Sequence, residues 1–131
     1  MKVFISSTDI DLKRDRAAVG EVLNRIDGVK AVRMEDFFAS YHPPVKECLD
    51  RLADCDVVVL LLGSRYGSID PERRLSVTEV EYRTAIDLGI PVLPFLKKVK
   101  GVWRSAESDD EVWSCPSLVD TKKYTALTTL A

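Results

Sequence analysis

The sequence predicts an α/β fold in which helices cover both faces of an open parallel β-sheet. The segment DVVVLLLG (56–63) is apolar at nearly every position, which is typical of a strand buried on both faces. Shorter apolar runs at 2–6 and 91–96 alternate with segments whose apolar residues recur at helical spacing. This alternation of strands and helices indicates a parallel sheet with right-handed crossovers.

Each expected element carries a local signal. Leu12, Val19 and Leu23 recur at helical spacing after KVFIS, and the intervening STD supplies typical helix-capping side chains. Gly28 suits the end of that helix, and Pro44 suits the first turn of the next one. The expected elements are a strand at 2–6, a helix over 12–28, a strand at 30–34, a helix over 44–55, a strand at 56–63, a polar loop at 64–75, a helix from about 76 to 89 and a strand at 91–96.

The element order favours a flavodoxin-like sheet with strand order 2-1-3-4. A fifth strand normally follows, but the polar stretch VWRSAESDDEVWS does not clearly supply one. We therefore expect a domain core at residues 1–96. The tail at 97–131 either completes the same domain or is divergent.

Composition excludes several classes of protein. A chain of 131 residues is expected to form one domain, and its formal charge of −2 does not favour nucleic-acid binding. No apolar run approaches the roughly 20 residues that span a bilayer, and MKVFISST is too short and too polar for a signal peptide. Cys48, Cys55 and Cys115 lack metal-ligand spacing, so we expect reduced thiols in a cytoplasmic protein without a membrane partner.

Several catalytic motifs are missing from the sequence. The single histidine, His42, stands in a YHPP turn, so Ser-His-Asp or Cys-His catalysis has no natural base. Neither a P-loop nor a G-x-G-x-x-G motif is present, and no Cys/His cluster indicates zinc. We expect no metal and no bound cofactor.

The binding crevice of such a sheet lies beyond the carboxyl ends of its strands, where the strand order reverses. The loops SSTD (6–9) and GSRYGS (63–68) are expected there. Ser6, Ser7 and Thr8 can bind phosphate or ribose through their hydroxyls and nearby helix N–H groups, or can simply cap the following helix.

Four further positions near the expected crevice have both a binding and a structural interpretation. Gly63 and Gly67 allow the backbone to approach a ligand closely, although turns also favour glycine. Arg65 can pair with a phosphate and Tyr66 can stack on a base, although such pairs are common on surfaces.

Three charged residues outside these loops fit structural roles better. Arg16 is expected to form a structural ion pair. Glu35 and Asp36, which end the second expected strand, can reach the rim of the crevice or lie in a solvated turn.

The segment SVTEVEYRTA (76–85) places two glutamates about 200° apart around a helix axis. Ser76 and Glu79 fit a capping box, in which the serine oxygen accepts the Glu79 N–H and the carboxylate returns to the Ser76 N–H. Glu81 has no such role and shares a face of small residues with Thr78 and Ala85, as either a ligand-facing or a solvated carboxylate.

Five motifs together resemble the domain-of-unknown-function family 4062: KVFISSTDIDLKRDR, MEDF, CDVVVLLLGSRYGS, SVTEVEYRTA and GIPVLPFL. They occur in order over about residues 2–96. The family is regarded as TIR-like and typically precedes STAND-type signalling NTPases. The resemblance implies a TIR-like fold, self-association or attached STAND NTPase domains as partners, and a role in immune or stress signalling.

A weaker resemblance concerns the chemistry. Nucleoside 2-deoxyribosyltransferases contain Thr-x-x-Glu followed by a glycine eight residues later, and Thr78, Glu81 and Gly89 match this spacing. NAD-cleaving TIR domains also carry a glutamate on the corresponding helix. Both groups break an N-glycosidic bond. The resemblance therefore implies that Glu81 is catalytic and that NAD or another nucleotide is the substrate or ligand. Arg83 departs from the transferase pattern, which has a small residue there.

Three hypotheses follow. The first is a TIR-like nucleotide N-glycosidase in which Glu81 stabilises an oxocarbenium-like transition state. The second is a non-catalytic signalling module that binds a nucleotide or assembles with copies of itself within a larger STAND-type protein. The third is a plain protein-interaction domain, expected if side chains fill the crevice.

Overall fold

The computed structural model describes residues 1–8, 12–37, 44–63, 65–97 and 103–105. The elements, in chain order, are β1 (Lys2–Ser7), α1 (Lys13–Asn24), β2 (Lys30–Val32), the 3₁₀ helix η1 (Met34–Asp36), α2 (Val45–Ala53), β3 (Val57–Leu62), β4 (Ile69–Asp70), β5 (Leu75–Ser76), α3 (Val77–Asp87), β6 (Val92–Lys97) and β7 (Trp103–Ser105).

The main sheet has the strand order β2-β1-β3-β6-β7, and its first four strands are parallel. The predicted order 2-1-3-4 is therefore confirmed, with β6 as the fourth parallel strand. β7 adds a fifth strand at the edge, and it runs antiparallel to β6. In the pairing of β1 with β3, Ser7 lies opposite Leu61, so the two strands end at the same edge of the sheet.

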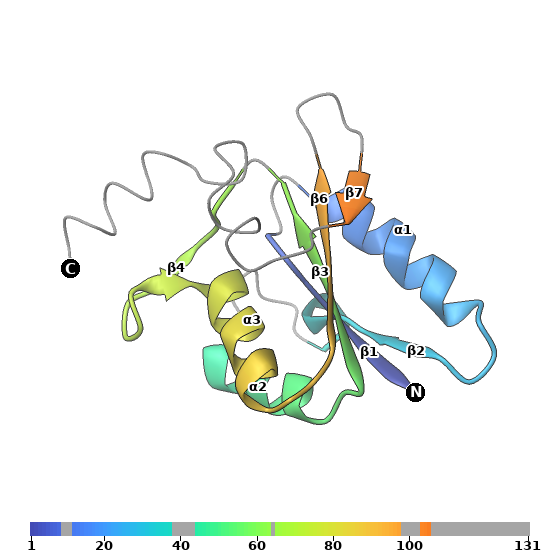
Figure 1. Ribbon diagram of the computed structural model, residues 1–131, viewed down its shortest axis with the longest axis horizontal. Coiled ribbons are helices and arrows are strands. Elements are labelled where there is room, and N and C mark those ends of the chain that lie inside the picture. Colours follow the sequence, from blue (N-terminus) through green and yellow to red (C-terminus); the bar gives the residue numbers. More distant parts are fainter. Residues whose placement is uncertain (9–11, 38–43, 64, 98–102, 106–131) are drawn as a thin grey trace.

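Helices cover both faces of the sheet, as predicted (Figure 1). Val3 and Ile5 point from β1 towards α1, where they pack in a cluster with Leu12. Phe4 points the opposite way and packs with Leu52 of α2 and other residues on that face. This division follows from the strand geometry, because successive side chains of a strand point to opposite faces.

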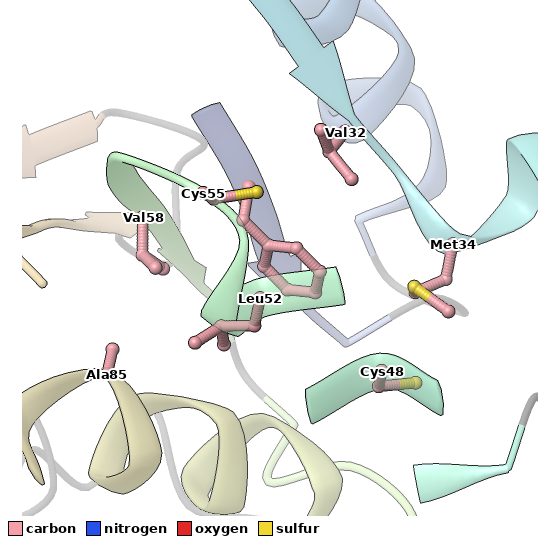
Figure 2. Close-up of a cluster of buried hydrophobic side chains, with 8 residues drawn as sticks. Val32, Met34, Cys48, Leu52, Cys55, Val58 and Ala85 are labelled. Atoms are coloured by element: carbon pink, nitrogen blue, oxygen red, sulfur yellow. The ribbon is translucent and has the colours of Figure 1, made fainter. Parts of the chain in front are cut away.

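The core between β1, α2 and α3 contains two free thiols (Figure 2). Cys48 and Cys55 are both buried in this core, and neither forms a disulfide. Burial is the main cause that raises the pKa of Cys48 to about 12 and that of Cys55 to about 11. Both thiols therefore stay protonated at neutral pH.

Two expected boundaries on this side of the chain were wrong. The strand expected at 30–34 ends at Val32, because the carbonyls of Arg33 and Met34 accept 3₁₀-type bonds and turn the chain into η1. Glu35 and Asp36 therefore belong to η1 and do not end a strand. Helix α1 likewise ends at Asn24, before the expected stop at Gly28.

The expected capping of α1 was also wrong. Its N-cap is Leu12, which has no side chain that can cap, and the helix begins only at Lys13. Ser6 and Ser7 belong to β1, and Thr8 comes directly after it. These hydroxyls therefore lie at the end of a strand and do not cap the helix.

The loop expected at 64–75 contains a short hairpin that the sequence analysis missed. Strands β4 and β5 pair as Ile69 with Ser76 and Asp70 with Leu75. The Asp70 carboxylate accepts from the Glu72 N–H at 3.2 Å and so shapes the turn. The Asp-Pro pair at 70–71 was the available signal, since Asp before Pro favours turn initiation.

Some expectations fall outside the described residues, namely the turn around His42, Cys115 and most of the tail at 97–131. In the described part of the chain, no helix combines the length and apolar character needed to cross a membrane.

Candidate functional site

Helix α3 begins with a side-chain cap. Ser76 is the N-cap residue, and its Oγ accepts a hydrogen bond of 3.1 Å from the Glu79 N–H. The expected return bond from the Glu79 carboxylate to the Ser76 N–H was wrong. The Ser76 N–H donates instead to the Tyr66 hydroxyl at 3.2 Å, and that hydroxyl donates to Glu79 Oε1 at 2.6 Å. Tyr66 thus bridges the two members of the cap.

The Glu79 carboxylate is fully engaged on this face of α3. Its Oε2 accepts a 2.7 Å bond from Arg83 Nε, one helical turn further along. Arg83 stands two positions after Glu81 and therefore lies on the opposite face of the helix. The bulky residue that departs from the transferase pattern thus pairs with Glu79 and does not fill the side of α3 that carries Glu81.

Glu81 is also buried, with only 5 % of its surface exposed, so its interpretation as a solvated glutamate was wrong. Its Oε1 accepts a hydrogen bond of 2.8 Å from the Ser6 hydroxyl at the carboxyl end of β1. Both glutamates of the segment are buried, because α3 contacts β1 on one side and has Tyr66 beside Glu79 on the other. Glu79 takes part in the cap at the start of α3, while Glu81 lies against the carboxyl end of β1.

Two oxygens near this edge lack partners. Within the described part of the chain, Glu81 Oε2 and the Thr78 hydroxyl form no hydrogen bond. Thr78 is 4 % exposed and lies one turn before Glu81 on the same face of α3. Neither oxygen is among the fully buried atoms without a hydrogen-bond partner, of which the described residues have only Arg51 Nε. Both oxygens therefore keep some contact with the surface, where water or a ligand can supply the bonds.

The environment of Glu81 disfavours its ionised form. Burial is the largest cause, and the Ser6 hydrogen bond and the Arg16 charge only partly oppose it, so that the pKa of Glu81 rises to about 7. Near neutral pH this carboxyl is therefore present in both protonation states. Strongly shifted pKa values of this kind are typical of functional sites, although structural networks also produce them.

A second polar cluster lies on the other side of β1. Arg16 of α1 is 6 % exposed and forms the ion pair expected for it, with bonds of 2.7 and 2.9 Å to the two carboxylate oxygens of Glu35. Its Nη1 also donates to Ser7 Oγ at 3.0 Å and to the Ile5 carbonyl at 3.3 Å. Ser7 is thereby engaged, and its own hydroxyl donates to the Thr8 carbonyl.

The loops after β1 and β3 lie against each other. Gly63 is buried directly after β3, and Gly67 has a φ of +98° beside the side chain of Thr8. A Cβ atom at position 67 would lie 2.7 Å from the Thr8 Cγ2 methyl. The structure therefore brings Ser6–Thr8 to the same sheet edge as Gly63 and Gly67, and the glycine at 67 is explained by this close approach.

Replacement of Gly67 by alanine should destabilise the protein by about 3 kcal/mol, from the positive φ and the clash with Thr8 together. Gly28→Ala is the matched control, since Gly28 has a φ of +79° but nothing within 4 Å of an added Cβ. The control should lose only about 1 kcal/mol. Urea denaturation of both variants measures this difference, and equal losses would contradict the close approach.

Arg65 and Tyr66 have different surroundings despite being adjacent. Tyr66 is buried and its hydroxyl belongs to the start of α3, so its environment is that of a structural residue. Arg65 is half-buried, and within the described residues its guanidinium forms neither a hydrogen bond nor an ion pair. Of the two, Arg65 is the group available to an anion.

Over the residues that the structure describes, no three His, Cys, Asp or Glu side chains gather so as to hold a metal ion.

The sequence analysis missed the bridging role of Tyr66 between Ser76 and Glu79. Its partners lie 10 and 13 positions away, and no spacing rule connects them.

Comparison with known proteins gives a family for this chain. The model of the domain of unknown function DUF4062 matches residues 2–129, beyond the motifs at 2–96 that carry the resemblance. No curated protein and no solved structure matches the chain significantly. Because the matched region covers nearly the whole sequence, the chain belongs to the DUF4062 family of domains of unknown function.

Proposed function

We propose that this domain is a TIR-like nucleotide N-glycosidase that hydrolyses NAD(P) or a related nucleoside, with Glu81 as the catalytic residue. In such a reaction the bond between the anomeric carbon and the base nitrogen breaks, and the base leaves with the bonding electron pair. Water adds to the anomeric carbon and gives up a proton. The ribosyl group becomes oxocarbenium-like between these events, so a nearby carboxylate lowers the barrier.

One observation carries this proposal: the Glu81 carboxylate is buried at the carboxyl end of β1 with one oxygen held and the other unsatisfied. Ser6 binds Oε1 at 2.8 Å and so fixes the orientation of the carboxylate. Within the described residues, Oε2 is left without a donor, which a ribose hydroxyl can supply. In an open parallel sheet, ligands bind at this edge.

Two further groups fit a phosphorylated ribose. The Thr78 hydroxyl lies beside Glu81 on α3 and can accept from or donate to a sugar hydroxyl. Arg65 follows β3 with its guanidinium unengaged in the described part of the chain, and a guanidinium suits a phosphate well. A carboxylate, a hydroxyl and a guanidinium together match the ribose and phosphate of a nucleotide.

The ionisation of Glu81 fits this chemistry. A pKa of about 7 leaves a substantial fraction of the carboxyl ionised at neutral pH. A developing positive charge on the ribose would favour the ionised form further, because an opposite charge nearby lowers the pKa of an acid. The carboxylate therefore interacts more strongly with the transition state than with an uncharged ground state, and this difference is what accelerates a reaction.

The second candidate is a non-catalytic module that binds a nucleotide or self-associates within a larger STAND-type signalling protein. The observation that favours it is the near-complete burial of Glu81 and Ser6, at 5 % and 0 % exposure, which limits the access of a large ligand. Under either proposal we place the domain in cytoplasmic immune or stress signalling, where clustering of copies would control its output.

The test is the release of nicotinamide from NAD at high protein concentration, with and without a crowding agent. Release that depends on the folded protein supports the enzyme, and stimulation by crowding supports control through self-association. If no nicotinamide appears even in the clustered protein, NAD cleavage is overturned. Calorimetry with NAD then decides the second candidate, since heat of binding without product formation identifies a nucleotide-binding module.

A further inference from the structure

The carboxyl end of β1 carries polar side chains on both faces of the sheet. Ser6 and Ser7 are consecutive, so their hydroxyls point to opposite faces. The Ser6 hydroxyl holds Glu81 on the α3 side, and the Ser7 hydroxyl accepts from Arg16 of α1. The same short stretch of strand therefore connects the candidate catalytic carboxylate to an ion pair in which Arg16 is buried and Glu35 is exposed.

Arg16 is held firmly where it lies. Its guanidinium binds both oxygens of Glu35, which is the bidentate geometry that carboxylates and guanidinium groups prefer. The bonds to Ser7 Oγ and to the Ile5 carbonyl tie the same guanidinium to β1 on either side of Ser6. Arg16 is therefore bonded to the strand residues on both sides of Ser6, the residue that positions Glu81.

The charges around Glu81 are few, and each comes from a different element. Ser6 of β1 donates a hydrogen bond to the carboxylate, while Arg16 of α1 attracts it and Glu35 of η1 repels it. The Cys48 thiol of α2 also interacts with Glu81, but burial keeps this thiol protonated and uncharged. The two full charges that act on Glu81 are thus the two members of a single ion pair.

We propose that Arg16, clamped by Glu35, is a positioning residue for Glu81, because it fixes the end of β1 on both sides of Ser6 through Ile5 and Ser7. The positive charge of Arg16 also favours the ionised form of Glu81. Glu35 binds Arg16 and partly offsets its positive charge. The pair therefore determines what fraction of Glu81 is ionised near neutral pH. The inference rests on the proposed function for its purpose, because only an ionised Glu81 can stabilise a ribosyl cation.

The test measures the ionisation of Glu81 directly, without substrate. Carbon-13 NMR of the glutamate side-chain carboxyl carbons follows the titration, and Glu81→Gln assigns the signal. Glu35→Gln should lower the pKa of Glu81 and Arg16→Gln should raise it, each by roughly half a pH unit or more. Arg16→Lys keeps the charge and should largely restore the original value.

A neighbouring ion pair provides matched controls. Arg33 and Asp36 form an exposed pair beside η1, at 2.9 Å, and neither is among the charges that act on Glu81. Arg33→Gln and Asp36→Asn should leave the Glu81 titration unchanged.

Opposite shifts from the two members of the Arg16–Glu35 pair support the positioning role, since a merely structural pair would give no shift or shifts of one sign. Shifts of the same sign, or none, overturn it. If Arg16→Gln does not fold, Glu35→Gln and Arg16→Lys still decide the question. Opposite shifts in a protein that releases no nicotinamide would leave the positioning role standing and overturn only the proposed reaction.

Discussion

Replacement of Glu81 by glutamine should lower the rate of nicotinamide release by about 100-fold to 1000-fold. Glutamine preserves the shape of the side chain and can still accept the Ser6 hydrogen bond, but it cannot carry the negative charge that an oxocarbenium-like transition state requires. The loss should appear in kcat and in kcat/KM together, because the missing interaction exists mainly in the transition state. Product formation by the variant and the wild type, followed side by side, measures it.

The same substitution should stabilise the fold at high pH. The pKa of Glu81 rises from an ordinary 4.5 to about 7 in the folded protein, so the folded state binds the proton more tightly than the unfolded chain. The contribution of Glu81 to the stability of the wild type is therefore fully present below pH 4.5 and is lost as the pH rises through 7. This loss is on the order of 3 kcal/mol, and Glu81→Gln should escape it.

Activity and stability should thus change in opposite directions with pH in the wild type. If the ionised carboxyl is the catalytic form, kcat/KM should rise through pH 7 while the free energy of unfolding falls. Urea denaturation across this pH range measures the free energy of unfolding of the wild type and of Glu81→Gln, and the comparison gives the part that depends on Glu81. A constant difference between the two proteins at all pH values would contradict the shifted pKa.

Glu79→Gln is the control for Glu81→Gln, because it makes the same chemical change two residues away on the same helix. The glutamine side chain can still accept from Tyr66, but the 2.7 Å ion pair with Arg83 is lost, so a modest destabilisation is expected. Once folded, this variant should keep its activity. Equal activity losses in both variants would show that the helix as a whole matters and would remove the specific role of Glu81.

Tyr66→Phe should destabilise the protein by about 4 kcal/mol, a large effect for the removal of one oxygen. The Tyr66 hydroxyl accepts from the buried Ser76 N–H and donates to the Glu79 carboxylate. Phenylalanine would leave a backbone donor and a carboxylate oxygen unsatisfied in a buried site, and hydrogen bonds to charged groups are the more costly ones to lose. Urea denaturation at neutral pH gives the loss.

The pKa of Tyr66 supports its role as a donor. Burial is the main cause that raises this pKa to about 12, so the hydroxyl keeps its proton at neutral pH and donates it to Glu79. Ser76→Ala is the control, since it removes the Ser76 hydroxyl but keeps the bonds of the Tyr66 hydroxyl to the Ser76 N–H and to Glu79, and it should cost about 1 kcal/mol. A loss below 1 kcal/mol for Tyr66→Phe would mean that solvent reaches the bridge and that it is not buried as described.

Much of the fold was predictable because its signals are local. The apolar stretch of β3, the helical spacing before Gly28 and the serine at the start of α3 each lie within one window of sequence. Their order along the chain then restricts the sheet to few topologies, and the arrangement β2-β1-β3-β6 agrees with the one expected. Strand β2 was predicted but with its end two residues too late, and η1 and the β4–β5 hairpin were missed. Three-residue and two-residue elements carry too few residues for a periodic pattern.

The sequence by itself determined the parallel sheet, the edge at which polar loops gather and the angle between Glu79 and Glu81, since these depend on periodicity and chain order. Only the tertiary structure decided what each glutamate meets. Glu79 is satisfied by Tyr66, while Glu81 is bound to Ser6 across 75 residues of chain and left with an unsatisfied oxygen in the described residues. The physical reason is that burial and hydrogen-bond partners arise from contacts between distant segments, which no local pattern contains.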